Sequence, residues 1–255
     1  MSLLADSAHV LTDSVGIFLA LAAVTLASRP TGAQRTFGLY RLEVLSALAN
    51  AVLLLAVAAW ALYEAIGRIS DPPDVPGAPL LIVGGIGLVT NVIALRLLSG
   101  GGSLAAEGAR LEVLADTIGS IGVVIGGAVI MITGLTVIDA WVGLTIALWI
   151  VPRSIRLATD ALRILLQSAP PDVDVDALTA DLAGVADVVD VHDLHVWTLT
   201  SDMEVLTAHV MVAVGADTHA VLDRARALLS ERHGIHHATL QVEPEDHTGC
   251  AEVDW

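Results

Sequence analysis

The sequence contains little cysteine, little charge and no lysine. Cys250 is the single cysteine among 255 residues, so the chain can form neither an internal disulfide nor a cysteine-based metal cluster. Charged residues make up only 16% of the chain, against about 25% in an ordinary soluble domain, whereas hydrophobic residues make up 55%. The 12 basic residues, all Arg, face 28 acidic ones, which is the reverse of a nucleic-acid-binding protein. This composition argues against disorder, a simple soluble globule and a nucleic-acid partner, and indicates several membrane spans.

Charge and histidine divide the chain into two parts. Residues 1–166 are nearly neutral, whereas residues 167–255 hold most of the acidic residues and all His but His9. The pair Pro170-Pro171 stops a helix near the boundary. We therefore predict an apolar transmembrane domain over residues 1–166 and an acidic, His-rich domain over residues 167–255.

Five apolar runs are long enough to cross ~30 Å of hydrocarbon, at about residues 3–28, 42–66, 79–98, 111–133 and 140–158. Arg residues concentrate in alternate connections, and the opposite side has only Arg68. The positive-inside rule then predicts that the Arg-rich loops and the C-terminal domain are cytoplasmic. With Met1 almost at the start of a span, five spans place the N-terminus outside, as if a first helix were missing. The Arg-only basic set, with abundant Ala, Gly and Val, suggests a GC-rich bacterial genome.

Ionisable residues occur inside two of these spans, where each has a high energetic cost. His9 and Asp13 lie on one face of the first predicted span, and Glu112 and Asp116 lie one turn apart on the fourth. Both faces continue with small residues that allow close helix approach: Gly16, Ala20, Ala23, Gly119, Gly122 and Gly126. We expect these faces to meet and to bring the four side chains together within the membrane.

One imidazole and three carboxylates can coordinate a divalent cation through nitrogen and oxygen. Protons compete for the same lone pairs, which gives a physical basis for exchanging metal against protons, with His9 as the natural proton carrier. The alternative is that these groups pair only with one another to hold helices together. Glu43 and Glu64, which lie at span edges close to Arg41 and Arg68, are interpreted as interfacial or structural.

The C-terminal part is predicted to form a small α+β domain with the order α-β-β-α-β, as in a ferredoxin-like sandwich. The expected elements are a helix at 173–183, strands at 188–198 and 204–214, a helix at 217–232 and a strand at 238–243. The first two strands form a hairpin through a turn at 200–203.

Histidines on this hairpin suggest a second metal site. If Thr200 pairs with Met203, Leu194 lies opposite His209, and His192 lies diagonally beside His209 on the same face. The last strand adds Glu243, with His237 at its start. The alternative is that these His residues are solvated and bind nothing; His233 and His236 are interpreted as surface residues.

Several segments together resemble the cation diffusion facilitator family of metal/proton antiporters. They are LLADSAHVLTDSVG, RTFGLYRLEVLSALANAVLLL, LYEAIGRI, EVLADTIGSIGVV and the distinctive VHDLHVWTLTSDMEVLTAHV. The resemblance implies a six-helix membrane bundle whose first helix is absent here, cytoplasmic termini, and a homodimer joined through the C-terminal domain. It implies a multi-pass protein of the bacterial inner membrane whose partners are the lipid bilayer, protons and a divalent metal ion.

The resemblance also implies roles for particular residues. The family's intramembrane zinc site matches His9, Asp13 and Asp116, whereas Glu112 replaces the usual His and hardens the site. The resemblance implies Zn(II) as substrate and regulatory ion. The harder site would admit Mn(II), Fe(II) or Co(II) beside zinc, and Cd(II) is a further candidate. The cytoplasmic sites match His192 and His209; Gln241 and Glu243 replace the terminal His and Asp of some members, so that site is incomplete or rebuilt with His237.

The sequence-based hypothesis is secondary efflux of a divalent cation, most readily Zn(II), in exchange for protons. One alternative is a membrane-anchored metal-binding sensor or transport-inactive truncated relative, and another is a structural protein. We predict no enzyme activity, because the sequence shows no nucleophile–base pair and no Gly-rich phosphate loop.

Overall fold

The computed structural model describes residues 22–70 apart from 24, 28 and 30, and residues 77–98, 104–200 and 203–247. The side chains of residues 70, 98, 104–112 and 115 are outside this description. The described residues divide into two compact units, one containing 47–158 and the other containing 22–46 and 159–247. The first predicted span lies largely outside the described residues.

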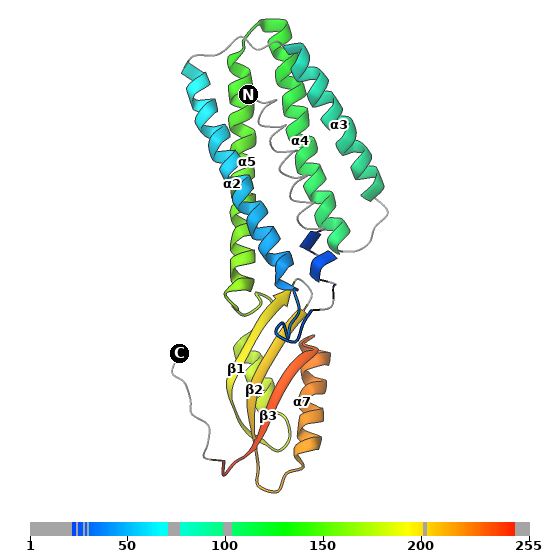
Figure 1. The fold of residues 1–255 in the computed structure, drawn as a ribbon, viewed down its shortest axis with the longest axis vertical. Coiled ribbons are helices and arrows are strands. Elements are labelled where there is room, and N and C mark those ends of the chain that lie inside the picture. Colours follow the sequence, from blue (N-terminus) through cyan, green and yellow to red (C-terminus); the bar gives the residue numbers. More distant parts are fainter. Residues whose placement is uncertain are drawn as a thin grey trace. The chain divides into compact units, whose positions relative to one another are not determined.

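The first unit is a bundle of long helices (Figure 1). Its helices are α2 (Arg41–Ser70), α3 (Gly77–Leu98), α4 (Leu104–Thr133) and α5 (Val137–Leu165). Each is long and apolar enough to cross a membrane. Large apolar side chains such as Ile82, Ile86 and Ile132 are exposed on them, as expected of helices surrounded by lipid rather than water. The prediction of a membrane helical bundle is confirmed.

Small residues allow the helices to pack closely. Gly77 of α3 lies against Gly127 of α4: a β-carbon added at Gly77 would stand 2.7 Å from the Gly127 carbonyl oxygen. Leu80, Val123 and Ile130 form the core beside this contact, with α5 side chains packed against them. Ala61 of α2 meets Ala147 of α5 in the same manner. These close approaches supply the van der Waals contacts that replace the hydrophobic effect within a bilayer.

The second unit contains a three-stranded sheet with two helices on one face (Figure 1). Its elements are α6 (Val175–Ala183), β1 (Val188–Thr200), β2 (Met203–Val212), α7 (Thr218–Arg232) and β3 (His237–Pro244). Asp174 and Asp217 cap the two helices by accepting backbone N–H bonds of their first turns. The order α-β-β-α-β and the small α+β domain agree with the prediction.

Leu178 and Leu182 of α6 and Leu229 of α7 are fully buried against the sheet residues Leu206 and Ala208. Side chains alternate along a strand, and Leu206 and Ala208 face this core. His209 therefore lies on the opposite face of the sheet. β1 and β2 pair antiparallel, and β2 and β3 pair parallel, so both outer strands flank β2.

The pairing of β1 with β2 differs from the prediction. Thr200 does pair with Met203, but His192, not Leu194, lies directly opposite His209. The reason is that β1 contains register shifts between Thr198 and Thr200 and again between His192 and His195. Each bulge inserts one extra residue into β1, so the two shifts move the partner of His209 by two positions.

The first turn of α2 and the segment before it contact the sheet within the second unit. Thr200 donates its hydroxyl to Glu43 Oε2 at 2.8 Å, and the rings of Phe37 and His237 meet edge to face, with centroids 6.3 Å apart. Glu43 therefore has a structural contact, as interpreted from the sequence. Glu64 and Arg68 form the expected i,i+4 ion pair at 2.8 Å.

Gly127→Leu should destabilise the bundle by about 1–3 kcal/mol, because the new side chain would overlap Leu80 and the backbone at Gly77. Gly85→Leu is the matched control on α3, since a β-carbon there meets no described atom within 4 Å. Thermal unfolding of both variants in one detergent measures the difference. Equal unfolding temperatures for the two variants would contradict the proposed close packing.

Candidate metal centre

The structure describes only part of the predicted intramembrane site. His9 and Asp13 lie outside the described residues, and Glu112 is described in its backbone alone. Because α4 is one continuous helix from Leu104 to Thr133, Glu112 and Asp116 lie one turn apart, as expected. The Asp116 side chain is half-buried. The site's assembly thus remains a prediction.

Polar groups continue along α4 beyond Asp116. Thr117 and Ser120 are buried in the bundle, where polar residues carry an energetic cost. Thr117 satisfies its hydroxyl by donating to the Val113 carbonyl, and Asn91 of α3 donates to the Ser120 hydroxyl at 3.3 Å. The polar positions of α4 that include Glu112 and Asp116 therefore continue as far as Ser120 within the apolar part of the helix.

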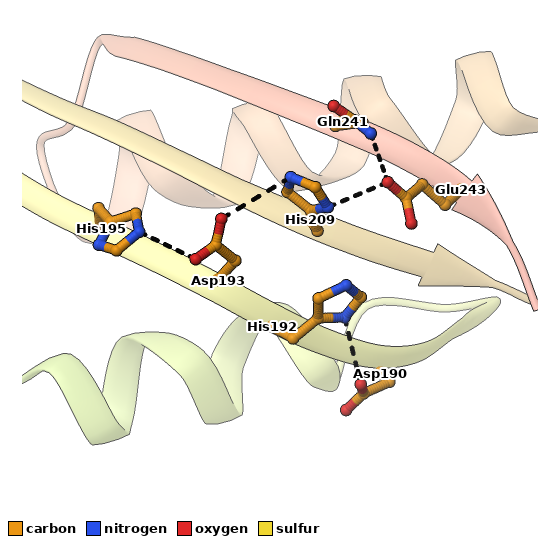
Figure 2. Close-up of polar contacts among 7 residues, drawn as sticks. All are labelled: Asp190, His192, Asp193, His195, His209, Gln241 and Glu243. Carbon is orange, nitrogen blue, oxygen red and sulfur yellow. Dashed lines mark hydrogen bonds and ion pairs between the residues drawn. The ribbon is translucent and has the colours of Figure 1, made fainter. Parts of the chain in front are cut away.

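The second unit brings together three of the four residues predicted for its metal site. His192 lies on β1, His209 on β2 and Glu243 on β3, and one ligand atom from each lies within 4.8 Å of the others. The two imidazole centroids are 5.2 Å apart. We call these three residues the sheet cluster. Figure 2 shows them facing one another on neighbouring strands.

His209 is held between two carboxylates (Figure 2). Its Nδ1 lies 3.0 Å from Glu243 Oε1, and its Nε2 lies 3.9 Å from Asp193 Oδ2. Gln241 donates its side-chain amide to the same Glu243 oxygen. His209 and Gln241 thus orient the Glu243 carboxylate. Only 4% of this residue is exposed.

His192 presents one nitrogen to a carboxylate and the other to the sheet cluster (Figure 2). Its Nδ1 lies 3.4 Å from Asp190 Oδ2. Its Nε2 is buried and has no hydrogen-bond partner among the residues that the structure describes. Such an atom is costly to leave without a partner, and a metal ion is a partner that fits an imidazole lone pair.

Two imidazoles and one carboxylate form a donor set suited to Zn(II), which accepts His nitrogen and Glu oxygen ligands with one position left open. The ion would also compensate the buried Glu243 charge. The three residues present therefore fit a divalent cation.

His237 is placed away from this cluster. It lies at the start of β3 opposite Val205, whereas His209 is opposite Gln241, four residues further along β3. At about 3.3 Å per residue, this separation is roughly 13 Å along the strand. His237 instead contacts Phe37.

Sequence reasoning missed the aspartates around the cluster and misjudged one histidine. Asp190 and Asp193 flank His192 in VDVHDLH, a signal that the spacing argument did not use. His233, interpreted as a surface residue, has a side chain only 15% exposed. Its Nε2 lies 2.9 Å from Asp181, so it connects the end of α7 to α6.

Comparison with known proteins identifies the family. The model described as the cation efflux transmembrane domain matches residues 1–166, and the model of the cation efflux protein cytoplasmic domain matches residues 170–245. The chain therefore belongs to the cation diffusion facilitator family, whose members include the cation efflux proteins. With its apolar helices, it is a multi-pass membrane protein.

Several curated relatives are similar over most of the chain. The metal cation efflux system protein CzcD of Cupriavidus metallidurans is 40% identical over 95% of this chain and 78% of its own length. The zinc transporter ZitB of Escherichia coli is 34% identical over 95% and 79%. The cadmium, cobalt and zinc/H(+)-K(+) antiporter of Bacillus subtilis is 31% identical over 97% and 81%.

A solved structure also matches. The metal-bound C-terminal domain of the CzcD transporter from Cupriavidus metallidurans is 32% identical, covering 28% of this chain and 99% of that domain, with a TM-score of 0.27.

His209→Ala should lower the affinity of the sheet cluster for Zn(II) by more than about 100-fold, above the effect usual for an outer-shell change, because it removes a ligand. Calorimetric titration of the purified chain measures this, in an Asp116→Asn background that weakens the intramembrane site. His219→Ala, an exposed residue on α7, is the control. Unchanged affinity in the His209 variant would refute the cluster as a metal site.

Proposed function

We propose that this protein exports a divalent metal cation, most readily Zn(II), from the cytoplasm in exchange for protons. The observation that carries the proposal is the family match over both parts of the chain, with relatives named for metal efflux, zinc transport and proton-coupled antiport. Residues 1–166 form the transport domain, and residues 167–255 form the cytoplasmic domain. The protein acts as a homodimer in a bacterial inner membrane, which agrees with the dimer domain model that it matches.

Transport follows from competition at the intramembrane site. His9, Asp13, Glu112 and Asp116 hold the ion through one imidazole nitrogen and carboxylate oxygens. Protons displace the ion because they bind the same lone pairs, so a proton entering from one side promotes metal release there. Alternating access carries the four-ligand site between the two membrane faces. Asp116 supports this role because it is a half-buried carboxylate on an apolar helix, where an ionisable group is costly unless it has a function.

The cytoplasmic domain has a separate role. The sheet cluster lies in the second unit and binds an ion that is not being transported. Binding there favours the folded, metal-loaded domain through linkage. It gives the protein a means to respond to cytoplasmic metal.

A second candidate is a membrane-anchored metal sensor that binds without moving the ion. The buried His192 Nε2 has no hydrogen-bond partner within the described part of the chain, which favours metal binding at the cytoplasmic domain whether or not the bundle transports. Flux separates the two functions, since a sensor shows saturable binding and no accumulation inside vesicles.

Asp116→Asn should reduce Zn(II) accumulation driven by a pH gradient in proteoliposomes to the level of empty vesicles. The amide retains the shape of the side chain but supplies neither the charge nor the proton site. Asp160→Asn, on an exposed position of α5, should transport at the rate of the unaltered protein. Accumulation at that same rate by Asp116→Asn would refute the site, and binding without flux in every form would favour the sensor.

Glu112→His should shift selectivity toward Zn(II) and Cd(II) over Mn(II), because an imidazole is a softer ligand than a carboxylate. We expect the ratio of zinc to manganese transport to rise by about tenfold, which corresponds to about 1.4 kcal/mol. Competition between the two ions in the vesicle assay measures the ratio. Glu107→His, an acidic position outside the proposed ligand set, should leave it unchanged.

A further inference from the structure

The two histidines of the sheet cluster share one arrangement. Each has one ring nitrogen toward the cluster and the other toward an aspartate of β1. For His192, Nδ1 lies 3.4 Å from Asp190 Oδ2, while the buried Nε2 has no hydrogen-bond partner in the segments that the structure describes. For His209, Nδ1 lies 3.0 Å from Glu243 and Nε2 lies 3.9 Å from Asp193 Oδ2. Figure 2 shows these aspartates on the outer sides of the two rings.

We propose that Asp190 and Asp193 are positioning residues of the cytoplasmic metal site, which hold His192 and His209 so that His192 Nε2 and His209 Nδ1 face the ion. The inference rests on the proposed function of the sheet cluster as a metal site. In this arrangement each aspartate accepts a hydrogen bond from the protonated nitrogen of one imidazole. The lone pair of the other nitrogen in that ring is then available to the metal.

The backbone of β1 explains how both aspartates reach their rings. Asp190 is two residues before His192, so the two side chains share a face of the strand. Asp193 follows His192 directly and would point to the other face of a regular strand. Instead, Asp193 has a φ of 49°, and the register shifts between His192 and His195. Asp tolerates this left-handed conformation better than most residues, and the bulge redirects its carboxylate toward His209.

A third histidine orients Asp193. His195 Nε2 lies 3.0 Å from Asp193 Oδ1, while the second carboxylate oxygen faces His209. A carboxylate held at one oxygen has fewer orientations available at the other. The 3.9 Å separation from His209 exceeds hydrogen-bond length, so the proposal includes a shortening of this contact when the ion draws the ring into place.

An aspartate behind each imidazole would strengthen its binding to a metal ion. A ligating histidine usually donates its second ring N–H to a carboxylate or carbonyl, which fixes the tautomer and increases the basicity of the ligating nitrogen. The two outer aspartates also offset part of the charge of a divalent ion, since His192, His209 and Glu243 together supply only one negative charge.

Both positions can be changed without removing buried structure. The side chains of Asp190 and Asp193 are 60% and 42% exposed, and neither belongs to the cores beneath the sheet. Substitutions at such exposed positions usually change stability little, and Asn tolerates the left-handed backbone of Asp193 as Asp does. A loss of affinity can therefore be separated from a loss of fold.

The test uses the full chain in detergent, with Asp116→Asn in every form to weaken the intramembrane site. Zn(II) is titrated in competition with a chromogenic chelator. Asp193→Asn and Asp190→Asn should each lower the affinity by about 10–100-fold while one ion still binds the cytoplasmic domain. Asp190→Glu, at a position outside the left-handed region, should recover most of the affinity lost in Asp190→Asn. Asp223→Asn, at an exposed position of α7, should bind as the parent does.

Two further measurements distinguish a positioning role of the aspartates from a purely structural role. The metal-free unfolding temperature should be the same in all variants, and bound Co(II) should keep the intense visible bands of a four-coordinate site. Unchanged affinity in both asparagine variants overturns the proposal, as does an affinity loss that parallels a lower metal-free unfolding temperature. If the parent binds no ion at the sheet cluster, the proposed metal site itself fails, which is a distinct outcome.

Discussion

The cytoplasmic domain is organised around a carboxylate that has been almost completely removed from water. Glu243 is 4% exposed, and its carboxylate contacts an imidazole and a side-chain amide. Burying a charged group is unfavourable unless it is paired. The paired strands β1, β2 and β3 solve this problem by presenting His192 and His209 to the same space. A divalent cation would complete the arrangement, since it would satisfy the carboxylate and the buried imidazole nitrogen together.

The helices of the first unit are held together by different interactions. Lipid supplies no hydrophobic drive between helices, so close contact at small residues such as Gly77, Gly127 and Ala61 determines how they pack. A carboxylate such as Asp116 can be maintained in such a bundle only where it faces its interior. Family membership is shown by matches to both parts of the chain, and it supports the proposal that this half-buried acidic position serves metal transport.

Sequence reasoning anticipated most elements of the fold, because their signals are local. The sequence pattern located α6, α7 and the strands to within about two residues, because the periodicity of apolar residues is a local signal. The α4 helix starts well before the apolar run expected from residue 111, because a helix continues beyond the hydrocarbon into polar surroundings. The length of an apolar run therefore reflects the hydrocarbon thickness that the helix crosses, not the full length of the helix.

The register of the sheet could not be predicted in the same way. The bulge at Asp193 depends on a left-handed backbone that Asp adopts without the clear signal that Gly would give. The distance of His237 from the cluster depends on the parallel register of β3 against β2, which packing across the whole domain determines. For the intramembrane site, spacing placed Glu112 and Asp116 on one face of α4, whereas their meeting with His9 and Asp13 depends on tertiary packing.

The three ligands of the sheet cluster are far apart in the chain, and this separation has a consequence for how the domain matures. α7 lies between β2 and β3 in the chain, and β3 pairs with β2, so the cluster is complete only when the last strand is in place. An ion captured there recognises the finished domain and not its precursors. At a free metal concentration 100 times the dissociation constant, capture would add about 2.7 kcal/mol to the free energy of unfolding. The supply of metal would then regulate the lifetime of the protein that removes it.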